Sequence, residues 1–122
     1  MAGLSQAEQV ATLDARFPTS GGTDYLAFSE NGTSESSILG RVGIGATGWA
    51  AATNATPSVK ANANALTTPA ATGAGTITHV AIFSAASGGT QRTDWQAVAA
   101  SRTLASGDVV TVAVGDFKIT LD

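Results

Sequence analysis

The run from Gly75 to Phe83 constrains the fold more than any other part of this chain. Most of its positions carry β-branched or aromatic side chains, which favour extended backbone, and residues 84–90 then turn to Ser, Ala and Gly. Successive side chains on a strand point to opposite sides, and both sets are largely apolar here. The run is therefore predicted to be the central strand of a sheet that protein covers on both faces.

The composition favours a thin core and a neutral surface. The chain has 122 residues, enough for one domain with its own core, and 43% are hydrophobic although only 6% are aromatic. Charged residues make up 12%, about half the usual share, so neighbouring subunits are expected to cover part of the surface. The net charge of -3 gives no basic footprint for phosphates, and no nucleic-acid partner is predicted.

Several classes of site and of compartment are excluded by what the sequence lacks. Cysteine is absent, which rules out disulfides and thiolate metal sites. No signal-like segment or membrane-length apolar run is present. We expect a chain made in the cytoplasm without a membrane partner and without a cofactor.

A short helix is predicted at the N-terminus. Ser5 and Glu8 have the spacing of a capping box, in which the serine hydroxyl accepts from the Glu8 amide. Pro18 disfavours helical backbone at the residue before it, so the helix should end near Arg16. Three apolar residues recur at helical spacing: Val10, Leu13 and Phe17.

A helix of about three turns is too short to be stable alone and must dock on other protein. We predict an N-terminal helical arm, residues 1–18, followed by a β-sandwich domain, residues 19–122. The arm docks either on its own sheet or on a neighbouring subunit, and the sequence leaves both open.

The rest of the chain reads as short strands separated by turns. An exposed polar loop is predicted at residues 30–37, where Asn31-Gly32 favours positive φ. No second helix is available for a parallel crossover, so the fold class is all-β, an antiparallel β-sandwich or jelly-roll-like domain, with a smaller open barrel as the alternative. Besides the central strand, strands are predicted at residues 24–29, 38–44, 58–61, 64–67, 94–100, 109–114 and 117–122.

Catalytic or metal-binding chemistry has little support. His79 is the only histidine and lies in mid-strand, so a multi-histidine metal site is excluded. The carboxylates are scattered, and one carboxylate per turn is a poor calcium cage. No catalytic or metal-ligating residue is predicted, and His79 is assigned a structural or surface role.

Large side chains are the remaining candidates for function. Trp49 and Trp95 are either core anchors or, with Tyr25, a platform on which a sugar stacks. The residues predicted for a subunit interface or the arm are Leu4, Val10, Leu13, Phe17, Trp49 and Trp95.

The order of several segments resembles a family of small virion proteins of tailed bacteriophages, labelled tail fibre or minor structural proteins. The segments are Ala11–Ala15 in the helix, Tyr-Leu-Ala-Phe at 25–28, Trp-Ala-Ala-Ala at 49–52, residues 75–90, and the C-terminal residues 107–110 and 117–121. The Ile-Thr-His-Val-Ala-Ile-Phe-Ser-Ala-Ala-Ser-Gly-Gly run is the strongest part. The resemblance brings no catalytic residues with it.

The resemblance implies a non-enzymatic structural protein of a phage virion, an accessory subunit of tail-fibre, minor-tail or capsid-decoration type. Its partners would be other virion proteins and further copies of itself, since a subunit repeated on a particle gains stability from its neighbours. The alternative is a carbohydrate-binding β-sandwich module that contacts a glycan of the host surface. A hydrolase that uses His79 is the third class considered.

Overall fold

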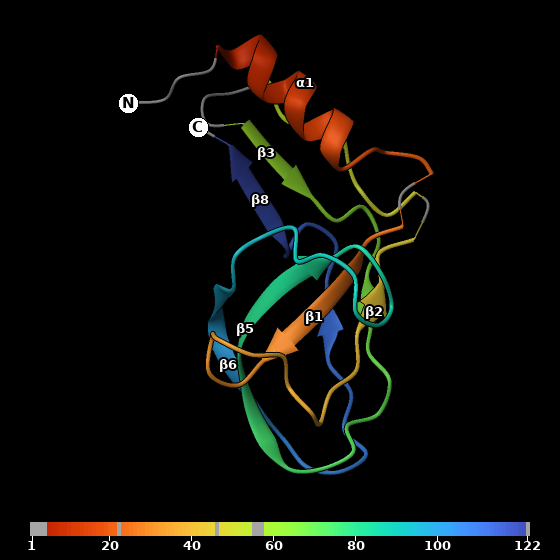
Figure 1. Cartoon of the computed structure of the whole chain (residues 1–122), viewed down its shortest axis with the longest axis vertical. Helices are drawn as coiled ribbons and strands as arrows, with labels where there is room; N and C mark the ends of the chain where they lie inside the picture. Colours follow the sequence, from red (N-terminus) through yellow and green to blue (C-terminus); the bar gives the residue numbers. More distant parts are fainter. Residues whose placement is uncertain (1–4, 22, 46, 55–57, 122) are drawn as a thin grey trace. The chain divides into compact units, whose positions relative to one another are not determined.

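The computed structural model describes residues 5–21, 23–45, 47–54 and 58–121. The strand pairs β1–β2, β1–β5, β5–β6 and β3–β8 are all antiparallel. This confirms the predicted all-β class with one short N-terminal helix, whereas the sandwich arrangement stays a prediction. The elements, drawn in Figure 1, are α1 (Gln6–Arg16), β1 (Tyr25–Ser29), β2 (Val42–Gly43), β3 (Ser58–Ala61), β4 (Leu66–Thr67), β5 (Gly75–Phe83), β6 (Gln96–Leu104), β7 (Thr111–Val112) and β8 (Lys118–Leu121).

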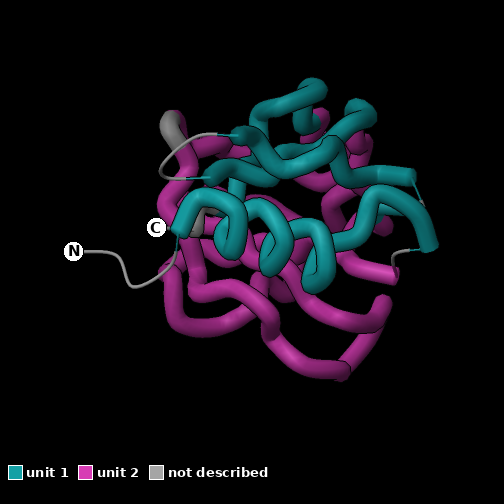
Figure 2. Tube along the Cα trace, turned by 90° about the horizontal axis from the view of Figure 1, so that it is seen from above, with its two compact units in different colours: residues 1–22, 44–65, 112–122 teal, residues 23–43, 66–111 magenta. Residues whose placement is uncertain are grey.

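The chain forms two compact units, each built from segments that are distant in sequence (Figure 2). The first unit, which we call the helix unit, comprises residues 1–22, 44–65 and 112–122. The second, which we call the sheet unit, comprises residues 23–43 and 66–111. The division into an arm and a sandwich domain at residue 18 stays a prediction.

The sheet unit is built on a four-stranded sheet with the order β2-β1-β5-β6. β5 lies between β1 and β6, which confirms its prediction as a central strand (Figure 1). On one side Phe28 of β1 faces Val80, and on the other Thr76 faces Thr103 of β6. The pairing of β5 with β6 is irregular between Ile77 and His79, where the edge strand carries extra residues and bulges.

Both faces of the two inner strands are covered. Consecutive residues on a strand point to opposite sides, and consecutive residues are buried in β1 from Leu26 to Ser29. In β5 the neighbours Ala81 and Ile82 are both fully buried. This is the two-sided burial that the apolar run predicted.

The helix unit contains α1, β3 and β8. Ser5 caps the helix, and its Oγ accepts a hydrogen bond from the Glu8 amide at 3.3 Å, as the capping box predicted. The helix ends at Arg16, and the Phe17 amide donates to the Leu13 carbonyl, in agreement with the stop expected before Pro18. α1 packs against β3, so in this chain the helix docks in its own unit.

The polar loop at residues 30–37 folds around two side chains. The Asn31 Oδ1 accepts from the Thr33 and Ser34 amides at 2.8 and 3.0 Å, and the Ser29 Oγ accepts from the Gly32 amide at 2.9 Å. Gly32 has a φ of 77°, which confirms the positive φ expected of an Asn-Gly pair. A Cβ placed on Gly32 would lie 2.9 Å from the His79 ring, so the imidazole packs directly on this glycine.

Three predicted strands are shorter than expected. Glycine-rich residues 38–44 give only β2, residues 64–67 give only β4, and residues 109–114 give only β7. Val109 and Val114 are 52% and 62% exposed, and the chain turns at Gly115, where the Asp116 amide donates to the Ala113 carbonyl. β8 pairs with β3 and β7 with β4, so the two C-terminal strands belong to different sheets.

Candidate functional site

The predicted interface residues are distributed over both units. Leu4 lies outside the described residues, and Val10 is half-buried. Leu13, Phe17 and Trp49 are buried in the helix unit, and Trp95 is half-buried in the sheet unit. Their assignment to a subunit interface stays a prediction.

Aromatic rings organise each unit separately. In the helix unit the ring centroid of Trp49 lies 5.3 Å from that of Phe17, which it meets edge-on, and 6.0 Å from that of Phe117. In the sheet unit Trp95 lies 5.8 Å from Phe83. Trp49 is therefore a core anchor, whereas Trp95 is only half-buried.

Polar contacts, in addition to apolar ones, hold α1 on β3. The Gln9 Oε1 accepts from the Ser58 amide at 3.1 Å, and both residues are fully buried. The Asp14 Oδ1 accepts from the Ala52 amide at 3.0 Å and from the Lys60 Nζ at 2.7 Å. The Lys60 side chain is completely buried, whereas Asp14 is 39% exposed.

The Asp14–Lys60 pair changes the acidity of the carboxyl group. The hydrogen bond from Lys60, assisted by the bond from the Ala52 amide, holds the pKa of Asp14 below its ordinary value of 3.8. Burial opposes this shift but does not cancel it. Asp14 therefore remains ionised opposite a lysine whose charge has been removed from water.

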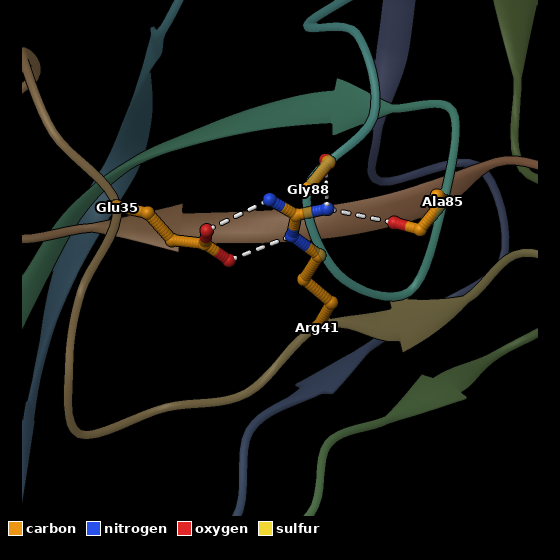
Figure 3. A network of polar contacts seen from close by, with 4 residues as sticks. All are labelled: Glu35, Arg41, Ala85 and Gly88. Carbon is orange, nitrogen blue, oxygen red and sulfur yellow. Dashed lines mark hydrogen bonds and ion pairs between the residues drawn. The ribbon is translucent and has the colours of Figure 1, made fainter.

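A second polar network in the sheet unit centres on Arg41 (Figure 3). Its Nε and Nη2 donate to the two carboxylate oxygens of Glu35 at 2.8 and 2.9 Å, and its Nη1 donates to the carbonyls of Ala85 and Gly88 at 2.7 and 2.8 Å. The guanidinium also lies 4.1 Å from the centre of the Phe83 ring. The hydrogen bonds to Glu35 raise the pKa of Arg41 above its usual value.

This network fixes an exposed loop at the end of β5. Residues 86–90 are exposed, and Gly88 and Gly89 have φ values of 64° and 71°. The Ser84 Oγ accepts from the Thr90 amide at 2.9 Å and closes the loop at its base. An open, polar pocket of about 290 Å³ adjoins it, lined by residues 35–37, 39–41 and 86–88. The sheet unit thus presents a concave surface whose backbone is held by a buried arginine.

His79 lies on β5 beside the polar loop, and its assignment to a structural or surface role stays a prediction. Its Nδ1 lies 2.8 Å from the Thr78 Oγ1, and its ring packs on Gly32. Among the described residues, no group of three or more histidine or acidic side chains is arranged to hold a metal ion. The arrangement offers packing and one hydrogen bond at this position.

The structure places several polar side chains at central positions that the sequence did not predict. Arg41, Lys60 and Asn62 each contact residues distant in the chain; Asn62, for example, accepts from the Phe117 amide at 2.9 Å and donates to the Ala113 carbonyl at 2.9 Å. A signal was present, since Lys60 lies within a predicted strand and Arg41 follows Leu39-Gly40 in a chain that has few charges.

Comparison with known proteins identifies the family. A sequence model of the family described as podophage GP4 fiber I protein gp80 matches residues 8–120, nearly the whole chain. No curated protein matches the sequence. In the part of the chain that is described, no helix has both the length and the apolar character to cross a membrane. Because the match spans both units and includes α1, we conclude that the chain belongs to the podophage GP4 fiber I protein gp80 family of tailed-phage tail-fibre structural proteins.

Proposed function

We propose that this protein is a non-enzymatic structural subunit of a phage tail fibre that is built into the virion through contacts with other copies and with neighbouring tail proteins. The family match over residues 8–120 carries the proposal. One property of the chain supports it. Only 12% of the residues are charged, which suits a surface that neighbouring subunits cover.

Labelled particles test this proposal. The protein is fused at its C-terminus to a small epitope, phage is propagated with the fusion, and purified virions are imaged with a gold-labelled antibody. Label on the tail supports the proposal. Label on the capsid, which a decoration protein would give, or virions that carry no label, would contradict it.

The second candidate function is glycan binding by the sheet unit. The half-buried position of Trp95 favours it. Trp49 is buried and cannot stack on a sugar, whereas Trp95 is half-buried and packs on Phe83, the ring that also carries Arg41. Host polysaccharide titrated into the protein should change the fluorescence of Trp95 in a Trp49→Phe variant. An unchanged spectrum at saturating polysaccharide counts against a glycan contact at this residue.

A hydrolytic role is tested through His79. A His79→Ala variant should assemble into particles that adsorb to and infect cells as wild type does, once its fold has been verified. Loss of an enzymatic activity on host polysaccharide in that variant would refute the non-enzymatic assignment.

A further inference from the structure

The helix α1 is attached to its own compact unit by side chains and not by its neighbours in the chain. Residues 44–65 and 112–122, which make up the rest of the helix unit, come much later in the sequence. The residues that directly follow the helix lead instead through Pro18 and Gly21 to β1, which belongs to the sheet unit. The docking contacts to Ala52, Ser58 and Lys60 therefore come from residues far along the chain, and not from the segment that joins the helix to β1.

The surface that receives the helix is specific. We define this acceptor surface by four residues: Trp49, Ala52, Ser58 and Lys60. Gln9 accepts from the Ser58 amide, Asp14 accepts from the Ala52 amide and from Lys60, and Phe17 packs edge-on against Trp49. Charge, hydrogen bonding and ring packing thus all select this one helix in one register.

An empty acceptor surface would be costly. Without the helix, the Lys60 ammonium group would lose the Asp14 carboxylate that now pairs with it, and the Ser58 amide would lose Gln9, its acceptor. A helix with this sequence satisfies both groups. A second copy of the chain supplies the same helix with the same contacts.

The segment between α1 and β1 bears on whether the docked helix comes from the same chain or from a second copy. Thr19, Ser20 and Gly21 are exposed, and Gly21 has a φ of 74° with no atom within 4 Å of a Cβ placed on it. These three residues of the turn are thus open to solvent. Exchange of an identical element is a low-cost route to association because it replaces contacts one for one.

We infer that copies of this chain are joined by arm exchange, in which α1 of one copy docks on the acceptor surface of a second copy. The inference rests on the proposed function, since a fibre holds copies at the high effective concentration that favours the exchanged form over the closed one. The acceptor surface binds α1 of a second copy and recognises it through the Asp14–Lys60 pair.

Isotope mixing on the wild-type full chain tests the inference. Equal amounts of ¹⁴N- and ¹⁵N-labelled chains are unfolded together and refolded at high concentration. A carbodiimide then joins Asp14 to Lys60, whose charged groups lie 2.7 Å apart. With exchange, about half of the Asp14–Lys60 cross-links in the dimer fraction join chains of different isotopes. Cross-links that join only chains of the same isotope, at every concentration, overturn the inference.

Charge reversal gives a second, independent readout. Asp14→Lys and Lys60→Asp chains each lose the pair, but a reciprocally exchanged dimer of the two restores it at both sites. Chains refolded together should form a dimer that neither variant forms alone, and the Asp14→Lys/Lys60→Asp double variant serves as the folding control. A mixture that remains monomeric while the double variant folds overturns the inference. If arm exchange is overturned in this way, gold label on the tail of purified virions would still support the proposed function.

Discussion

Replacement of Arg41 by lysine should destabilise the sheet unit by about 2–3 kcal/mol. The arginine makes four charge-assisted hydrogen bonds, two to Glu35 and two to the carbonyls of Ala85 and Gly88. A lysine ammonium cannot reproduce the planar fork and reaches only part of this set. Hydrogen bonds to charged groups contribute about 1.5–3 kcal/mol each, but Glu35 is 32% exposed and water replaces part of what is lost.

Thermal and denaturant unfolding measure this loss. A decrease of about 2–3 kcal/mol corresponds to a fall in Tm of roughly 6–15 °C for a domain of this size. Amide hydrogen exchange should accelerate in residues 84–90 more than elsewhere in the sheet unit, because the hydrogen bonds from Arg41 hold that loop. The matched control is Arg102→Lys, since Arg102 is exposed on β6 and its replacement should change stability by less than about 0.5 kcal/mol. An Arg41→Lys variant as stable as the control, with unchanged exchange in the loop, would refute this reasoning.

Three further outcomes follow from contacts described above. The pKa of Asp14 is lowered in the folded state, so the stability that this carboxylate contributes is present above its ordinary pKa of 3.8 and is lost as the pH falls through the lower, folded value. The denaturant midpoint should therefore decline more steeply in acid for wild type than for Asp14→Asn. Gly32→Ala should cost about 1–3 kcal/mol in thermal unfolding and more than Gly21→Ala, because both positions have positive φ but only Gly32 also meets the His79 ring. Acrylamide should quench Trp95 in Trp49→Phe more strongly than Trp49 in Trp95→Phe, and equal quenching would contradict the burial of Trp49.

The elements that sequence analysis predicted well are those specified by neighbouring residues. Ser5 and Pro18 define the two ends of α1 locally, and β3 and the start of β5 fall at their expected residues. Side-chain alternation and capping act over a few positions, so one chain is enough to detect them. The same reasoning placed β5 at the centre of a sheet, because apolar residues on both faces require cover on both sides.

The contacts that were missed join residues far apart in sequence. Arg41 binds carbonyls more than forty positions away, and Lys60 meets Asp14 across a similar separation. No local pattern marks such a partner, since the pairing depends on tertiary structure. The shortened strands have a related cause: alternating valines at residues 109–114 match a strand, but the turn at Gly115 and the pairing of β8 with β3 determine where that segment lies.

The Asn31-Gly32 loop has a consequence for the chemical ageing of the protein. An asparagine followed by glycine is prone to deamidation, because the glycine amide nitrogen attacks the side-chain carbonyl carbon, the bond from that carbon to Nδ2 breaks with release of ammonia, and a cyclic imide forms. In this loop the Gly32 amide donates to the Ser29 Oγ, and the Asn31 Oδ1 accepts from two backbone amides, so the attacking nitrogen and its target are held by other partners. We expect the folded loop to deamidate more slowly than the same segment as a free peptide, and mass spectrometry of stored protein measures the difference. In a protein that remains in an assembled particle, such a loop slows the accumulation of deamidated chains.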